Sequence, residues 1–255
     1  MTLVKICGVR SPEVALAAAE AGADFVGLMF AESRRKVTPQ ECYDIVQALK
    51  EKRTQGPGVP PGGTPNAEFD GPARGDVSAR TWFGVWADAI EQAAARWRPL
   101  IVGVFADQTS DEVNDIADAA GLDLVQLSGG ETQGFIERIE RPVIRAIHVA
   151  QGETAFDVFD AISAGSAAGL MLDTASDTAR GGTGEVFDWG VAAEVAARTP
   201  FLLAGGLSPE NVAEAVAQVQ PWGVDVSSGV ETDGMKDVEK IRAFVRAVKG
   251  VRVGR

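Results

Sequence analysis

A thiol and a carboxylic acid stand at the ends of two strand-like apolar runs in this chain. Cys7 ends the run Leu3–Cys7 just before Gly8, and Asp173 follows the run that begins at Leu170. Apolar flanks raise the pKa of a carboxyl group, so Asp173 could donate a proton while the Cys7 thiolate removes one. We therefore predict an acid and base pair. The alternatives are that Cys7 is an inert core residue and that Asp173 caps a local turn.

Two glycine turns near the end of the chain have the composition of a phosphate site. Each follows a short apolar run, and their residues are Gly205, Gly206, Ser227, Ser228 and Gly229. The pair Ser208-Pro209 is a typical helix start, so we expect free N–H groups and the positive end of a helix dipole to point at a ligand above the first turn. The alternative is that the glycines only permit tight turns.

A basic triplet and a glycine run complete the candidate site. Arg34-Arg35-Lys36 follows the second strand-like run, and a guanidinium can bind a carboxylate through two hydrogen bonds. We predict that this triplet holds a carboxylate, with at least one member facing solvent. The run 180–184 could close over the ligand, with Gly182 as a further phosphate contact, or be only a flexible loop. Asp107 is a third carboxylate after a strand-like run.

The elements that must position these residues form a repeating unit. Strand-like runs begin near Leu3, Asp24, Leu100, Asp123, Pro142, Ala168, Phe201 and Gly223, with helical patterns between them. Eight such units predict an α/β fold, a single (β/α)8 TIM barrel over residues 1–255, in which the two glycine turns follow strands 7 and 8. The rival, an open doubly wound sheet, usually carries G-x-G-x-x-G after its first strand, and Gly8 has no such partners.

Alternation within the strands predicts an ion pair inside this barrel. If Val4 and Ile6 face the helices, Lys5 and Cys7 face the interior. Asp225 faces inward on strand 8, which is the neighbour of strand 1 once the barrel closes. Because an unpaired buried ammonium is costly, we predict that Lys5 and Asp225 pair near the site.

One connection is much longer than the others. An insertion of about residues 51–97 separates the second and third strands, and its part from 54 to 78 is rich in Pro and Gly, which predicts a surface loop. After it, Trp82, Trp86, Ile90 and Trp97 recur at near-helical spacing. We expect this stripe to pack on the outside of the barrel; the alternative is a subunit interface.

Composition excludes several partners. The chain has 24 basic and 36 acidic residues and a net charge of -12, which argues against nucleic acid and anionic membranes. Cys7 and Cys42 give neither a disulfide framework nor a metal spacing, and His148 is the single histidine, so we expect no metal. No N-terminal apolar run and no stretch of about 18 apolar residues is present, so we expect a soluble, cytoplasmic protein.

Taken in order, these motifs resemble those of phosphoribosylanthranilate isomerases, a family of tryptophan biosynthesis that carries out an Amadori rearrangement. The similarity covers nearly the whole chain except about 51–96, and it is carried by the segments 4–8, 22–24, 102–105, 125–127, 172–174, 181–184, 187–189, 205–212 and 224–231.

The resemblance implies a role for each candidate residue. Cys7 would be the general base, Asp173 the general acid, Arg35 the ligand of the anthranilate carboxylate and the two glycine turns the phosphate site. We place Lys5, Gln126 and Asp225 among the substrate-binding residues as well. The expected ligand is a phosphorylated small molecule, with no cofactor, and the expected assembly is a monomer or a homodimer. We also expect the site, through Lys5 and the substrate iminium, to lower the pKa of Cys7.

Two departures and three rivals accompany this prediction. The chain has Ser128 in a Gln-Leu-Ser-Gly segment where the family usually has histidine, and Arg145 where lysine is common. A related sugar-amine isomerase of the histidine pathway is one rival, although that family carries Asp where Cys7 stands. The others are a non-catalytic barrel that binds a phosphorylated ligand and a scaffold whose tryptophan helix binds a partner.

Overall fold

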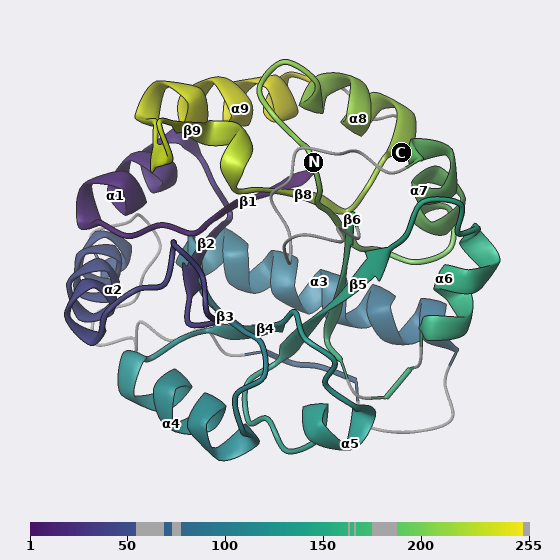
Figure 1. Ribbon diagram of the computed structural model, residues 1–255, viewed down its shortest axis with the longest axis horizontal. Coiled ribbons are helices and arrows are strands. Elements are labelled where there is room, and N and C mark those ends of the chain that lie inside the picture. Colours follow the sequence, from purple (N-terminus) through teal and green to yellow (C-terminus); the bar gives the residue numbers. More distant parts are fainter. Residues whose placement is uncertain (55–68, 73–77, 163, 166, 175–187, 252–255) are drawn as a thin grey trace.

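Eight parallel strands close into a barrel within the part of the chain that the structure describes (Figure 1). The structure is a computed structural model that describes residues 1–54, 69–72, 78–162, 164–165, 167–174 and 188–251. The strands pair in chain order and the last closes on the first; they are β1 (Leu3–Cys7), β2 (Phe25–Met29), β3 (Leu100–Phe105), β4 (Leu124–Leu127), β5 (Val143–Val149), β6 (Gly169–Thr174), β7 (Leu202–Leu203) and β8 (Gly223–Val226). The predicted (β/α)8 barrel is confirmed.

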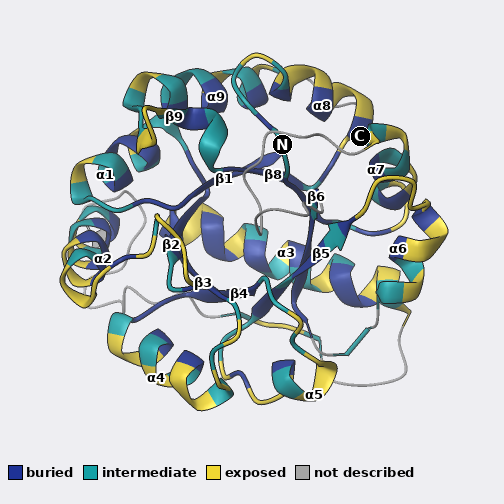
Figure 2. Cartoon of the chain, viewed as in Figure 1, coloured by how far each residue is buried: buried dark blue, intermediate teal, exposed yellow. Residues whose placement is uncertain are grey.

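Helices surround the barrel between the strands. They are α1 (Pro12–Ala21), α2 (Pro39–Thr54), α4 (Ser110–Ala120), α5 (Gln133–Ile136), α6 (Ala155–Ala161), α7 (Trp189–Ala196), α8 (Val212–Val219) and α9 (Val238–Gly250). After β8 the chain forms the short 3₁₀ turn η1 (Ser228–Val230) and a hairpin of β9 (Glu231–Thr232) and β10 (Met235–Lys236). Figure 2 shows the exposed faces of the outer helices turned away from a buried barrel.

The expected helix start at Ser208 is wrong. The same Ser/Thr-Pro pattern does begin α1 and α2, where Ser11 and Thr38 cap the first turn. In the third case the helix, α8, begins only at Val212. Asn211 is the reason, because its side chain accepts a hydrogen bond from the Ser208 backbone N–H and donates one to the Gly206 carbonyl, which fixes a separate turn ahead of the helix.

Alternation along the strands divides the core into two parts. Outward residues such as Val4 and Ile6 pack between barrel and helices, as predicted. Inward residues at the N-terminal ends of the strands form an apolar floor that includes Leu3, Phe25, Leu100, Leu124, Ile144 and Leu202. Polar inward residues are therefore left for the middle and the carboxyl ends of the strands, where Lys5 of β1 pairs with Asp225 of β8.

Helix α3 (Ala79–Trp97) covers this floor from outside the barrel. Figure 1 shows it crossing behind the strands. Its C-terminal half contributes Ile90 and Trp97 to the same cluster as the floor residues, while Trp82 packs in the outer core and donates its indole N–H to the Ala167 carbonyl, 2.6 Å away. From below β8, the Trp222 indole N–H donates to the Glu91 carboxylate at 3.0 Å.

The tryptophan stripe packs against the outside of the barrel as expected, and its C-terminal half closes the N-terminal end of the barrel. An apolar floor exposed at the end of a barrel needs a cover, and this helix supplies one. Most of the expected loop from 54 to 78 lies outside the described residues.

We predict that α3 contributes strongly to stability and not to the chemistry. Ile90→Ala should lower the free energy of unfolding by about 2 to 5 kcal/mol, because Ile90 is fully buried in the floor cluster. Val85→Ala, at an exposed position of the same helix, should stay within about 0.5 kcal/mol of the parent. Urea unfolding measures both; equal effects would contradict the packing described here.

Candidate active site

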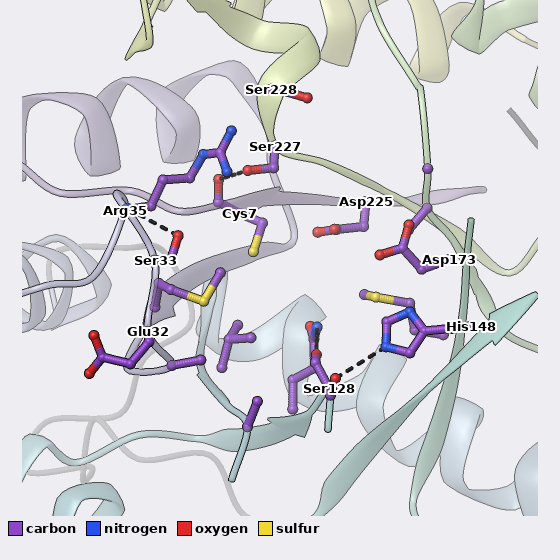
Figure 3. A pocket seen from close by; sticks show the side chains of 18 of the residues that line it. Cys7, Glu32, Ser33, Arg35, Ser128, His148, Asp173, Asp225, Ser227 and Ser228 are labelled. Carbon is purple, nitrogen blue, oxygen red and sulfur yellow. Dashed lines mark hydrogen bonds between the residues drawn. The ribbon is translucent and has the colours of Figure 1, made fainter. Parts of the chain in front are cut away.

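A cavity of about 820 Å³ opens at the carboxyl ends of the strands (Figure 3). Nine of the predicted site residues line it: Cys7, Arg35, Gln126, Asp173, Gly205, Gly206, Asp225, Ser227 and Ser228. Lys5 lies buried beneath it, paired with Asp225. Gly229 belongs to the η1 turn and is not among the residues that line the cavity. Gly182 and the run 180–184 lie outside the described residues. The topology therefore gathers residues from both ends of the sequence in one cavity.

Asp173 lies near the end of β6, next to His148 of β5 in the sheet register. Burial raises the pKa of its carboxyl group to about 6, with a further rise from the nearby Asp225 and an opposing effect from His148. The predicted rise in this pKa is confirmed. A carboxyl group with such a pKa is available in both protonation states near neutral pH, as a general acid requires.

Cys7 lies at the end of β1, buried and with a free thiol. Burial raises its pKa above the ordinary value; the Lys5 ammonium, which attracts and hydrogen-bonds the thiolate, lowers it, and Asp225 raises it again. The expectation that the site lowers this pKa is therefore wrong for the protein alone. The physical reason is that loss of hydration outweighs the attraction of Lys5, whose charge Asp225 already balances.

The predicted ion pair between Lys5 and Asp225 is confirmed. The two charged groups are 2.8 Å apart, and the Lys5 side chain is 0% exposed. Burial alone would lower the pKa of Lys5, but attraction by Asp225 and Cys7 outweighs it, so the pKa is raised. A fixed positive charge consequently lies directly beneath the thiol.

The two glycine turns pack directly against each other. A side chain at Gly229 would place its Cβ 1.9 Å from the Leu207 carbonyl oxygen, and one at Gly205, where φ is +87°, would meet the Thr174 hydroxyl oxygen at 2.1 Å. Only glycine permits this close approach. Within the described residues, the backbone N–H groups of Gly206 and Gly229 donate no hydrogen bond to the protein. The paired turns therefore present bare donors near the hydroxyl groups of Ser227 and Ser228.

The basic triplet divides as expected into an anchored member and solvated ones. Arg35 is 12% exposed, and it donates from Nε and Nη2 to the two carboxylate oxygens of Glu231, at 2.7 and 3.1 Å. Arg34 donates to the same carboxylate at 2.6 Å but is 56% exposed. Lys36 pairs with Glu32 at the surface. Arg35 is thus the member held rigidly at the cavity.

Sequence reasoning gave no role to Glu231 or its partner Lys236. Glu231 ends the last motif of the chain, yet nothing in its spacing indicates which loop it contacts. Lys236 donates from Nζ to Glu231 at 2.9 Å and to the Ser227 carbonyl at 2.8 Å. The carboxylate of Glu231 has its pKa lowered to about 2; burial opposes this shift, and its bonds to Arg35 and Lys236 outweigh burial.

Three further polar side chains complete the lining. Gln126 donates from its amide to the Ser128 hydroxyl at 2.9 Å, while its buried carbonyl oxygen has no hydrogen-bond partner among the described residues. His148, considered above only as a metal ligand, lines the cavity with Nε2 3.1 Å from the Ser128 carbonyl. Asp107 lies at the rim. The sequence analysis singled out Asp107 because it follows β3. It gave His148 no role in the cavity, although the alternation of side chains along β5 could have indicated that His148 faces inward.

The described residues contain no group of three or more His, Cys, Asp or Glu side chains arranged to hold a metal ion. The same part of the chain has no helix with the length and apolar character needed to cross a membrane.

Comparison with known proteins gives a consistent result. Residues 65–247 match the family described as N-(5'phosphoribosyl)anthranilate (PRA) isomerase. An N-(5'-phosphoribosyl)anthranilate isomerase of Dehalococcoides mccartyi is 39% identical over 254 residues, spanning 98% of this chain and 96% of the relative. One from Roseiflexus castenholzii is 39% identical over 250 residues, spanning 97% of this chain and 98% of the relative.

Solved structures agree with the sequence relatives. The crystal structure of the isomerase from Thermotoga maritima superposes with a TM-score of 0.71 at 28% identity, covering 98% of this chain and 100% of that one. A second isomerase structure, with a TM-score of 0.67 and 28% identity over the same shares, is a complex with reduced 1-(o-carboxyphenylamino)-1-deoxyribulose 5-phosphate. The predicted family is confirmed: this chain belongs to the N-(5'-phosphoribosyl)anthranilate isomerases, the isomerase family of tryptophan biosynthesis.

Proposed function

We propose that this chain converts N-(5'-phosphoribosyl)anthranilate into 1-(2-carboxyphenylamino)-1-deoxyribulose 5-phosphate with Asp173 as general acid and Cys7 as general base. The observation that carries the proposal is the meeting of these two side chains in one cavity. Figure 3 shows them facing it from β6 and β1, with Asp225 between them in that view. An acid and a base on separate strands can act on two different atoms of one substrate.

The acid acts first. Asp173 gives its proton to the ring oxygen of the ribose, the bond between that oxygen and C1′ breaks, and the anthranilate nitrogen takes up the positive charge as an iminium. A carboxyl group with a pKa of about 6 is a strong enough acid for this step and is still protonated in a useful fraction of molecules near neutral pH.

The base acts on the iminium. Cys7 as thiolate removes the proton from C2′, and the electron pair moves to neutralise the nitrogen, which gives an enolamine that tautomerises to the ketone. Burial raises the pKa of Cys7 in the protein alone, so the reaction needs added positive charge near the sulfur. The iminium of the substrate supplies that charge, in addition to the Lys5 ammonium already beneath the sulfur. The iminium is also the electron sink, so the step requires no cofactor.

The two ends of the substrate match two parts of the cavity. The paired glycine turns, with the hydroxyl groups of Ser227 and Ser228, offer neutral donors to the phosphate. Arg35 offers a guanidinium to the anthranilate carboxylate. The unpartnered carbonyl oxygen of Gln126 can accept a hydrogen bond from the amine or a ribose hydroxyl. Gly182, outside the described residues, stays a predicted phosphate contact.

We also propose the setting in which the enzyme works. A catalytic thiol must stay reduced, and both cysteines are free, which favours the cytoplasm. A net charge of -12 disfavours nucleic acid and anionic membranes as partners. The chain would act as one domain, as a monomer or a homodimer; light scattering after size exclusion distinguishes the two.

The direct test is the fluorescence of freshly made phosphoribosylanthranilate, which changes as it is consumed. Turnover supports the proposal. Binding without turnover would favour a non-catalytic barrel, and turnover of the histidine-pathway sugar amine alone would favour the related isomerase.

Cys7→Ser should fold normally and bind the reduced product analogue as well as the parent does. Because an alcohol is far less acidic than a thiol, its kcat should fall by on the order of 10²-fold or more, the scale of one general base. Cys7→Asp should keep part of the activity. Steady-state kinetics check this; if Cys7→Ser and Cys7→Ala both stay within a few-fold of the parent, the base is Asp107 or Asp225.

Arg35→Ala should raise KM or lower kcat/KM. The change should correspond to a loss of about 2 to 3 kcal/mol of binding free energy, the usual scale of a charge-assisted hydrogen bond. Arg34→Ala is the matched control and should be nearly silent, because Arg34 is the exposed member of the triplet. Equal effects would show that a diffuse field, and not one guanidinium, binds the carboxylate.

Asp173→Asn tests the energetic cost of keeping a carboxyl group in this cavity. The pKa of about 6 lies above the ordinary 3.8, so between these values the folded chain binds more protons than the unfolded chain. The contribution of Asp173 to stability therefore falls as the pH rises from about 4 to about 6. At pH 8 the inactive variant should be more stable than the parent by about 1 to 3 kcal/mol, and at pH 4 nearly equal to it.

Urea unfolding at the two pH values measures this difference. Asp225→Asn is the matched control and should lower stability at pH 8, because it leaves the buried Lys5 without its partner. A stabilisation by Asp173→Asn that does not change with pH would contradict the assigned cause.

A further inference from the structure

Glu231 is surrounded by cations from two separate parts of the chain. Its side chain is 5% exposed and accepts hydrogen bonds from Arg34 and Arg35 of the loop after β2 and from Lys236 of β10. It is not among the residues that line the cavity, whereas Arg35 is. Glu231 therefore contacts Arg35 from behind, away from the space that the substrate would fill.

The contact occupies one particular edge of the Arg35 guanidinium. Nε and Nη2 each donate to one carboxylate oxygen of Glu231, which is the two-point geometry of a strong arginine pair. Within the described residues, Nη1 makes no hydrogen bond. The edge formed by Nη1 and the second hydrogen of Nη2 is left for another acceptor, because a guanidinium carries five N–H groups in a rigid fork.

The rest of the Arg35 side chain is also fixed. It crosses over Gly8, where an added Cβ would lie 2.6 Å from the Arg35 Cδ. The guanidinium is thus held at its stem by the turn after β1 and at one edge by Glu231, so little conformational freedom remains to be lost when a ligand binds.

We propose that Glu231 is a positioning residue that holds one edge of Arg35 so that the opposite edge binds the substrate carboxylate. This inference rests on the proposed role of Arg35. Lys236 extends the arrangement, because the same ammonium bonds both Glu231 and the Ser227 carbonyl. The group that orients the carboxylate ligand is therefore tied to the turn assigned to the phosphate at the other end of the substrate.

The charges give the test its direction. Arg34, Arg35 and Lys236 carry three positive charges against one negative charge on Glu231, a net charge of +2. Glu231→Gln, which keeps the size of the side chain, raises this to +3. If only the field mattered, the variant would bind the anionic substrate more tightly and KM would fall. If Glu231 positions Arg35, KM rises although the site has become more positive.

The experiment compares two substrates of the full-length enzyme: phosphoribosylanthranilate and phosphoribosylaniline, which lacks the carboxylate. For Glu231→Gln we expect KM for phosphoribosylanthranilate to rise about tenfold, with kcat changed less than about threefold. For phosphoribosylaniline, kcat/KM should stay within about twofold of the parent. In the Arg35→Ala background, Glu231→Gln should have no further effect on either substrate, since the group that it positions is gone.

Two further variants serve as controls. Arg34→Ala removes another ion pair of Glu231 at an exposed position, and KM should stay within about twofold of the parent. Glu231→Asp keeps the charge but is one methylene shorter, so it should give an intermediate KM. The same comparison of the two substrates with Glu231→Asp decides the question if Glu231→Gln does not fold.

The opposing outcomes are distinct. A KM that falls or stays unchanged in Glu231→Gln, or an equal loss on both substrates, overturns the positioning role while the proposed function stands. If Arg35→Ala leaves KM for phosphoribosylanthranilate unchanged, the assignment of Arg35 fails and the inference with it. A parent enzyme that does not turn over phosphoribosylanthranilate overturns both.

Discussion

The buried ion pair between Lys5 and Asp225 influences the pKa of both Cys7 and Asp173. It joins the first strand to the last at the point where the barrel closes, directly beneath the thiol of Cys7. Each member of the pair also changes the pKa of groups in the cavity above it. Lys5 favours the thiolate, while Asp225 disfavours negative charge on both Cys7 and Asp173. Losing either partner would leave an unpaired buried charge, so the pair constrains the fold and the chemistry together.

The same ion pair bears on the protonation of the two groups to which the proposed mechanism assigns the chemistry. In the protein alone the pKa of Cys7 is raised, and the pKa of Asp173 is raised to about 6. In the proposed mechanism the substrate changes that balance, because ring opening converts a neutral amine into a cation. In the proposed mechanism, Cys7 therefore becomes a stronger base only after Asp173 has given up its proton, which fits a two-step proton transfer.

The N-terminal end of the barrel contributes packing to stability, and the carboxyl end carries the candidate site. The N-terminal end is filled by apolar first residues of the strands and covered by α3, while the carboxyl end carries glycine turns, charged loops and the cavity. Because the apolar floor supplies core packing, the upper layer of the barrel can hold polar and charged groups. Charged groups are also paired at the rim, where the Glu231 carboxylate joins the loop after β2 to the segment after β8.

The sequence by itself determined the repeating unit and most of the site. Eight apolar runs separated by helical patterns, inward alternation on β1 and β8, and glycines after β7 and β8 were enough to predict the barrel, the Lys5–Asp225 pair and the positions of Cys7 and Asp173. The two-residue period of a strand decides which side chains face inward, and the number of units favours closure. Only the tertiary structure decided the place of α3, the later start of α8, the direction of the Cys7 pKa shift and the partner of Arg35. Most of these depend on segments far apart in the chain. The cover of the apolar floor, the loss of water around the Cys7 thiol and the contact of Glu231 with a guanidinium 196 residues earlier are examples. The later start of α8 depends on a local side-chain contact, that of Asn211 with Gly206. Local pattern carries no information on contacts between distant segments.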